Sequence, residues 1–242
     1  MKHIVSLSGG KDSTAMLLRM IELGMPIDEI RFLDTGWEYP QTYKHIKKLE
    51  QYIGREIIIV KPIISFDELF QRHGFPHVKC RWCTHMKRDS LNRGIGKEDY
   101  SYIGYTYDEL PRIKKKVKKR GIEIYPLIEW GWTEEDCLQY CYSKGFTWDG
   151  LYTIFKRVSC WCCPFQSKRS LYALYKHFPE LWEKLKEMQR QAPNSFRPNQ
   201  TVFDLEKEFQ LKDRQYKLFN NLKTHQKFHL VKSLDAQLSN LN

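Results

Sequence analysis

A short stretch near the start of the chain, Ile4 to Leu17 (IVSLSGGKDSTAML), constrains the fold more than any other. An apolar run leads into two glycines, and an apolar pattern with helical spacing follows them. Glycine allows a tight turn and a close approach of backbone to a ligand, and the first amides of a helix lack partners within the helix. A strand, a glycine loop and a helix in this order typically hold phosphate groups. We therefore predict a phosphate-binding loop that consists of Ser8, Gly9, Gly10, Lys11, Asp12 and Ser13.

The first half of the chain alternates between two kinds of apolar pattern. Strand-like runs occur at residues 3–8, 30–36, 55–62, 100–106 and 122–128, and helical patterns occur at 13–23 and 43–53. Buried strands that alternate with helices predict a doubly wound, Rossmann-like α/β fold with a mainly parallel sheet. Ligands of such sheets bind at the carboxyl ends of the strands.

The second half of the chain is mainly helical in pattern. Apolar residues recur at helical spacing over residues 170–191, and helices resume over 203–241. We predict two regions: residues 1–165 form a nucleotide-binding α/β domain with a cysteine site, and residues 166–242 form a basic helical extension.

The formal net charge of +11 favours an anionic partner, with a nucleotide or nucleic acid ahead of a membrane. The basic run RIKKKVKKRG at residues 112–121 fits nucleic acid and a solvated surface equally well. No apolar run is long enough to span a bilayer, and the N-terminus does not have the pattern of a signal peptide. We therefore expect a cytoplasmic protein that does not bind membranes.

Seven cysteines in a reducing compartment favour metal or redox chemistry over disulfides. Two C-x-x-C pairs, Cys80/Cys83 and Cys160/Cys163, together offer four thiolates, which suit a [4Fe–4S] cluster or a tetrahedral zinc ion. Cys162 is an additional thiol that either replaces Cys160 or Cys163 as a ligand or stays free as a reactive thiol. Three further residues have simpler expectations: His85 is an alternative zinc ligand, and Cys137 and Cys141 are small buried residues of a helix.

The six residues of the loop, S-G-G-K-D-S, resemble the PP-loop of the ATP pyrophosphatases and adenine nucleotide alpha-hydrolases. Members of that superfamily split ATP between its α and β phosphates. The segment DTGWEYPQT at residues 34–42 is similar to a motif of the phosphoadenylylsulfate (PAPS) reductase branch, with Gln41 in place of a glutamate. GYTYDELPRIKK, with Thr106 in place of an arginine, and PLIEWGWTEEDCLQY resemble two further segments of that branch.

The resemblance implies an adenine nucleotide against the loop and against Asp34, Thr35 and Gly36 after the second strand. It implies that Lys11 binds the β and γ phosphates, with Mg²⁺ beside Asp12. It also favours a [4Fe–4S] cluster over zinc, because related PP-loop enzymes commonly combine this fold with a cluster. In the reductase branch, a basic residue after the first cysteine pair contacts the nucleotide, which makes Lys87 and Arg88 candidates.

Three hypotheses for function follow from the resemblance. Sulfonucleotide reductases use a cysteine near the C-terminus, and this sequence has none after Cys163. The first hypothesis is therefore an ATP-dependent, AMP-forming sulfur transferase, with Cys162 as a sulfur carrier. Its acceptor would be tRNA or DNA, and a cysteine desulfurase or thioredoxin-like protein would be the donor. The second is an adenylylsulfate or PAPS reductase, and the third is a nucleotide-binding subunit of a DNA-modification or defence complex.

Overall fold

The computed structural model describes residues 1–113 and 121–221 of the 242-residue chain. The chain divides into two compact units, Met1–Asn194 and Ser195–Asn242. The predicted division after residue 165 stays a prediction. Most of the basic run at 112–121, and the end of the predicted helix over 203–241, lie outside the described residues.

The first unit contains a five-stranded sheet with the strand order β3-β2-β1-β4-β5, in which all neighbouring strands are parallel. The chain runs outward from β1 to β3 and then returns to the other side of β1, so the topological switch point lies between β1 and β4. The predicted doubly wound α/β fold is confirmed. The strands are β1 (His3–Leu7), β2 (Glu29–Leu33), β3 (Ile58–Val60), β4 (Tyr100–Ile103) and β5 (Ile122–Ile124).

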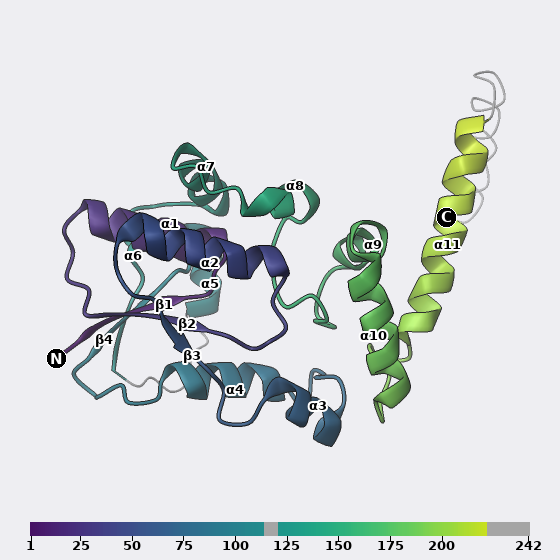
Figure 1. Cartoon of the computed structure of the whole chain (residues 1–242), viewed down its shortest axis with the longest axis horizontal. Helices are drawn as coiled ribbons and strands as arrows, with labels where there is room; N and C mark the ends of the chain where they lie inside the picture. Colours follow the sequence, from purple (N-terminus) through teal and green to yellow (C-terminus); the bar gives the residue numbers. More distant parts are fainter. Residues whose placement is uncertain (114–120, 222–242) are drawn as a thin grey trace. The chain divides into compact units, whose positions relative to one another are not determined.

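Helices cover both faces of this sheet, with α1 and α2 on one face and α4 on the other (Figure 1). A loop that contains Cys160, Cys162 and Cys163 separates α8 from α9. The α-helices before this loop are α1 (Lys11–Glu22), α2 (Pro40–Ile53), α3 (Phe66–His73), α4 (Trp82–Leu91), α5 (Leu110–Ile113), α6 (Pro126–Glu129), α7 (Glu134–Ser143) and α8 (Leu151–Ile154). After that loop come α9 (Lys168–His177), α10 (Pro179–Gln191) and, in the second unit, α11 (Val202–Asn221).

The core of the first unit forms where β1 packs against α1. Ile4 and Val5 of β1 are fully buried, as are Met16 and Leu17 of α1. Since burial of apolar area is the main favourable term in folding, this contact anchors the chain on both sides of the glycine loop. The loop therefore has a fixed starting and ending point.

Several predicted boundaries are corrected by the structure. Helix α1 begins at Lys11 rather than at residue 13, and α2 begins at Pro40, because proline is well suited to the first turn of a helix. Strand β5 ends at Ile124 rather than near residue 128, since Pro126 begins the short helix α6. Helix α4 was not predicted, and it includes Cys83 of the first C-x-x-C pair.

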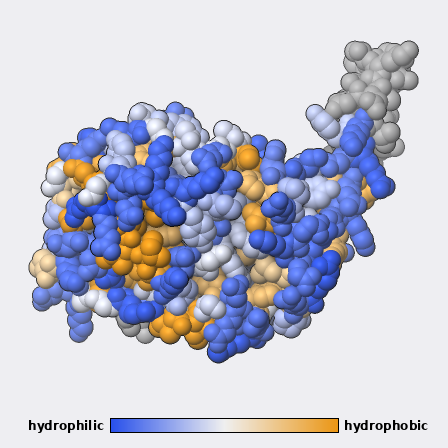
Figure 2. Space-filling view, in the orientation of Figure 1, coloured by the Kyte–Doolittle hydropathy of each residue, from blue (hydrophilic) through white to orange (hydrophobic). Residues whose placement is uncertain are grey.

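Among the described residues, no helix combines the length and the apolar composition that a bilayer crossing requires. Figure 2 shows a face with mainly hydrophilic side chains, interrupted by smaller apolar patches.

Gly9 is the position where the loop tolerates a side chain least. It has a φ of +76°, and a Cβ there would lie 2.9 Å from Thr42 Cγ2 and 3.1 Å from Phe32 Cε2. Gly24 has a similar φ of +64° but faces open space. We expect Gly24→Ala to cost about 1 kcal/mol of unfolding free energy for the left-handed backbone, and Gly9→Ala to cost a further ~1–3 kcal/mol for the clash.

Urea denaturation of the two alanine variants measures this difference, with Gly24→Ala as the matched control. Equal losses of unfolding free energy would show that close packing at Gly9 does not constrain the loop.

Candidate functional site

The glycine loop is held in shape by its own two serines. The Ser8 and Ser13 hydroxyls lie 2.9 Å apart, the Ser8 amide donates to Ser13 Oγ at 3.1 Å, and Ser13 Oγ donates to the Gly10 carbonyl at 3.2 Å. Within the described part of the chain, the amides of Gly9, Asp12 and Ser13 have no hydrogen-bond acceptor. These amides are therefore available to an anion at the positive end of α1.

The loop also lies directly against the end of β4. A Cβ at Gly104 would lie 2.9 Å from Ser13 Cα and 3.0 Å from its nitrogen. Only glycine therefore allows the loop to approach this strand so closely. The sequence resemblance had pointed to this segment, but not to the reason for its glycine.

A cavity of about 340 Å³ opens at the carboxyl ends of β1, β2 and β4. Its position is the switch point of the sheet, where ligands of doubly wound folds bind, and its volume lies within the usual range of ligand pockets. Residues of five segments line it, including Ser8, Ser13, Leu33, Glu38, Lys87, Gly104, Tyr105 and Ser159. The structure thus brings the loop serines and Lys87 together, as predicted for a nucleotide site.

Lys11 and Asp12 make contacts beneath the loop and are not among the residues that line this cavity. The Lys11 side chain is only 5% exposed, and its Nζ lies 2.9 Å from Asp12 Oδ1 and 3.0 Å from Glu134 Oε2. Burial opposes the charge of Lys11, but the two carboxylates outweigh it and raise the pKa of Lys11. Burial also raises the pKa of Asp12, while Lys11 acts to lower it. The described residues therefore hold Lys11 in an ion-paired state.

The segment after α7 contacts the outer side of the loop. Trp148 Nε1 donates to the Gly9 carbonyl at 2.8 Å, and the Tyr152 hydroxyl accepts the Lys11 amide at 2.8 Å. Trp148 and Asp149 both have left-handed backbone conformations, with φ values of +49° and +48°. Such strain persists only where surrounding contacts impose it. We call these contacts of Trp148 and Tyr152 with the loop the brace. The sequence did not predict it, because no local motif includes these residues.

His45 on α2 supports the same brace from within the core. Its Nε2 lies 2.9 Å from Thr14 Oγ1, and its ring stacks on Trp148 with centroids 4.2 Å apart. Burial, with a smaller contribution from Lys48, lowers the pKa of His45 to about 3. The folded protein therefore keeps this imidazole neutral at physiological pH.

The His45 environment predicts a pH-dependent stability. The unfolded chain binds a proton at His45 near pH 6.5, and the folded chain does not until about pH 3. The stabilisation is therefore complete above pH 6.5 and is lost as the pH falls, by about 2 kcal/mol at pH 5. Urea denaturation of wild type and His45→Gln at pH 7 and pH 5 measures it, since glutamine does not titrate. A pH dependence that is equal in both proteins would contradict the prediction.

The predicted Asp34, Thr35 and Gly36 form a turn directly after β2. Asp34 Oδ1 accepts the Gly36 amide at 2.8 Å and the Tyr43 hydroxyl at 2.7 Å, so this carboxylate is occupied within the turn. Thr35 Oγ1 donates to Glu38 Oε1 at 2.9 Å. Of this segment, Glu38 is the residue that lines the cavity under the loop, and the sequence had not singled it out.

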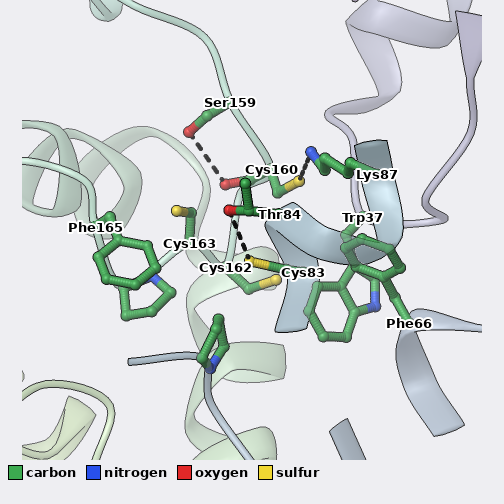
Figure 3. Close-up of a pocket in the computed structure, with 12 residues that line it drawn as sticks. Trp37, Phe66, Cys83, Thr84, Lys87, Ser159, Cys160, Cys162, Cys163 and Phe165 are labelled. Atoms are coloured by element: carbon green, nitrogen blue, oxygen red, sulfur yellow. Dashed lines mark hydrogen bonds between the residues drawn. The ribbon is translucent and has the colours of Figure 1, made fainter. Parts of the chain in front are cut away.

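Four cysteines line a second, smaller cavity of about 140 Å³ beside Trp37 and Phe66 (Figure 3). Cys83 comes from the first turn of α4, and Cys160, Cys162 and Cys163 come from the loop before α9. Three of the four predicted ligands thus share one cavity, together with Cys162.

The remaining cysteines lie elsewhere. Cys80 is exposed, pairs with His77 through its backbone, and is not among the residues that line the cysteine cavity. Cys137 and Cys141 are fully buried in α7, as expected for small apolar residues.

Lys87 and Glu38 place opposite charges at the edge of the cysteine cavity. Lys87 Nζ lies 3.0 Å from Cys160 Sγ and 3.8 Å from Glu38 Oε1, and Cys160 Sγ lies 3.5 Å from the same carboxylate oxygen. Burial and Glu38 raise the pKa of Cys160 to about 12, while Lys87 acts in the opposite direction. Burial opposes the charge of Lys87 as well, but Cys160 and Glu38 outweigh it and raise the pKa of Lys87.

Lys87 lines both the cysteine cavity and the cavity under the loop, which makes it the basic residue shared by the two. Arg88, the other predicted contact, is exposed on α4 beside Asp89 and His85. It lines neither of these two cavities.

A buried hydroxyl provides a test of whether a metal group fits here. Tyr39 is 1% exposed, and its hydroxyl has no hydrogen-bond partner within the described chain. Burial, with smaller contributions from Cys162, Cys160 and Cys163, raises its pKa, so the hydroxyl keeps its proton and can donate. Cluster sulfides and metal-bound thiolates accept such hydrogen bonds. The donor set therefore fits a thiolate-held metal group, although no three metal-binding side chains of the described residues are yet arranged around one point.

Tyr39→Phe distinguishes the metal-free protein from the loaded protein. Removing an unpaired buried hydroxyl is expected to raise the unfolding free energy of the metal-free protein by about 1 kcal/mol. After anaerobic reconstitution with iron and sulfide, the same variant is expected to be less stable than wild type, because a hydrogen bond to sulfur is lost. Thermal unfolding of both forms measures the change.

Tyr43→Phe is the matched control, because the Tyr43 hydroxyl already donates to Asp34. It should destabilise both forms equally. An effect of Tyr39→Phe that does not depend on reconstitution would mean that this hydroxyl does not face the bound group.

The parallel sheet, the glycine loop at its switch point and the cysteine cavity beside it define a PP-loop α/β protein. The family model of the phosphoadenosine phosphosulfate reductase domain matches residues 2–166, and the chain belongs to this family. The predicted resemblance to the reductase branch is confirmed.

Two relatives show how far the similarity extends. An uncharacterized protein of Methanocaldococcus jannaschii is 30% identical over 210 residues, which cover 78% of this chain and 41% of that protein. The adenosine 5'-phosphosulfate reductase of a Geobacillus species is 30% identical over 147 residues, 57% of this chain and 62% of the reductase. The chain thus spans less than two thirds of either relative.

Two solved structures match part of the chain. The PAPS reductase of Candida auris matches with a TM-score of 0.48 and 19% identity, over 66% of this chain and 82% of that one. The U34-tRNA thiolase NcsA of Methanococcus maripaludis was solved with its [4Fe-4S] cluster. It matches with a TM-score of 0.44 and 18% identity, over 78% of this chain and 71% of that one.

Proposed function

We propose that this protein is an AMP-forming enzyme that binds ATP at the glycine loop, adenylates an acceptor and supports sulfur transfer to it. The main observation in support of the proposal is that two cavities have lining residues in common. Lys87 and Ser159 line both the cavity under the loop and the cysteine cavity. An acceptor activated in the first cavity would therefore lie next to the thiols of the second.

The loop would act on the phosphates through its backbone. The free amides at the start of α1 point an array of donors toward an anion, and fixed donors of this kind stabilise charge that develops in a transition state. Pyrophosphate would leave from this end, and attack by an acceptor oxygen on the α-phosphorus would produce an adenylated acceptor. Asp12 offers a carboxylate oxygen of the kind that Mg²⁺ prefers, and Lys11 Nζ would then turn from Asp12 to the phosphate tail.

The cysteine cavity would serve the sulfur step. Cys83, Cys160 and Cys163 are the thiols that we propose as ligands there, with Cys80 as a fourth ligand only if its loop moves inward. A cluster bound by these thiols would supply an iron site for sulfur, and zinc would hold the loop without this chemistry. Burial raises the pKa of Cys162 well above its usual range, so our proposed sulfur carrier remains a protected thiol until it reacts.

The acceptor and the donor are the least constrained parts of the proposal. The net charge of +11 supports tRNA or DNA as the acceptor. A cysteine desulfurase or a thioredoxin-like protein would deliver sulfur or electrons to the cysteine cavity.

Exchange of labelled pyrophosphate into ATP, measured with total tRNA or with sheared DNA present, tests the adenylation step. We expect exchange by wild type and a loss of about 100-fold in Lys11→Met, the usual scale for removal of a charge-stabilising group. The double variant Lys11→Met/Glu134→Gln removes one of the carboxylates that the single variant leaves unpaired. It should regain stability but not exchange.

Lys44→Met is the control, since Lys44 is exposed and pairs with Asp149 on the surface. It should exchange at the wild-type rate. Undiminished exchange in Lys11→Met would reject the assignment of Lys11 and the loop to ATP.

The 30% identity with an adenosine 5'-phosphosulfate reductase favours a second candidate, a sulfonucleotide reductase. Sulfite release from adenylylsulfate in the presence of thioredoxin would identify that activity directly. Such release without pyrophosphate exchange would replace the first proposal with the second.

A further inference from the structure

A third hollow, of about 640 Å³, lies within the loop between α8 and α9 and is not explained by nucleotide or metal binding. The segment 156–170 forms it entirely. Two cations, Lys156 and Arg157, line it, and there is no carboxylate among its lining residues. The other lining residues are Val158, Ser159, Cys163, Phe165, Gln166, Ser167 and Ser170.

This hollow adjoins both of the cavities described above. It shares Ser159, Cys163 and Phe165 with the cysteine cavity, and Val158 and Ser159 with the cavity under the glycine loop. Ser159 therefore lines all three. A molecule in the hollow would have one end at the nucleotide and another at the cysteines, which is the position that an acceptor needs.

The charges of the hollow select for an anion. Arg157 donates to Glu109 at 2.6 Å and lies 3.7 Å from Glu134, so neighbouring carboxylates already balance its charge. Lys156 is exposed, and no carboxylate of the described residues forms an ion pair with it. Lys156 thus supplies a cation that a phosphate group would neutralise.

An aromatic side chain, Phe165, also lines the hollow. Phe165 is 42% exposed, and the Arg81 guanidinium lies 4.9 Å from its ring centroid. Figure 3 shows Phe165 and Lys87 on opposite sides of the cysteine set. Exposed aromatic rings next to a cation are the platforms on which unpaired bases stack.

We propose that the hollow of residues 156–170 binds one unpaired nucleotide of a nucleic-acid strand, with its base on Phe165 and its phosphate at Lys156. The inference rests on the proposed function and names the acceptor of that reaction. A duplex would not present a base in this way, because paired bases are stacked within the helix. The strand would pass over the loop before α9, and the nucleotide to be modified would reach Ser159.

Fluorescence anisotropy of the full-length protein with labelled 12-mer single strands, RNA and DNA of the same sequence, tests the inference. Wild type should bind a single strand more tightly than the matching duplex, and binding should weaken as salt rises. Lys156→Glu and Phe165→Leu should each weaken binding about tenfold. Phe165→Leu retains an apolar side chain of similar size, so it removes the aromatic face with little effect on packing.

Lys97→Glu is the charge-matched control, because Lys97 is exposed and does not line the hollow. Its affinity should stay within about threefold of wild type. Equal losses in Lys97→Glu and Lys156→Glu would overturn the proposal in favour of a general basic surface. A free mononucleotide that binds as tightly as the strand would overturn the assignment to nucleic acid.

Pyrophosphate exchange measured with the same variants separates this inference from the proposed function. Wild-type ATP affinity in Lys156→Glu, with weakened strand binding, supports both. If wild type exchanges pyrophosphate but binds none of the strands, the proposal that the hollow binds a nucleotide is wrong, and the proposed activity stands. If wild type binds strands but does not exchange pyrophosphate, the proposed ATP-dependent activity is wrong.

Discussion

The close approach of the glycine loop to β4 and α2 is the constraint on which the rest of the site depends. Gly9 turns the chain where a side chain would strike Thr42, and Gly104 leaves room for the backbone of Ser13. The two loop serines then bond to each other, and the amides of Gly9, Asp12 and Ser13 stay without an acceptor among the described residues. Because the core contact between β1 and α1 holds both ends of the loop, packing within the protein already fixes the loop's conformation.

The same end of the sheet also places a group of thiols beside the cavity under the loop. Glu38 follows β2 and Lys87 lies on α4, and these two side chains meet at Cys160. Their opposite charges act on this thiol in opposite directions, and Tyr39 adds an unpaired donor on the buried side. A thiol environment of this kind resists ionisation, and a neutral thiol is a weaker nucleophile than a thiolate.

Much of the fold could be predicted from the sequence, because its signals are local. All five strands coincide with apolar runs, and the strand–glycine–helix pattern located the loop within two residues. Helix α4 was missed, since its residues are mostly polar and the C-x-x-C spacing fits a loop equally well. The brace was missed for another reason: Tyr152 and Lys11 are 141 positions apart, so no local pattern connects them.

The class of protein can be recognised from the sequence alone, because the S-G-G-K-D-S loop and the paired cysteines are particular residues at fixed short spacings. Only the tertiary structure decided which cysteines share a cavity, with Cys162 inside it and Cys80 outside. It also decided that Lys11 is ion-paired beneath the loop and that Ser159 borders three cavities. These properties arise from crossovers that bring distant segments to one edge of the sheet, and the geometry of such crossovers depends on packing rather than on local spacing.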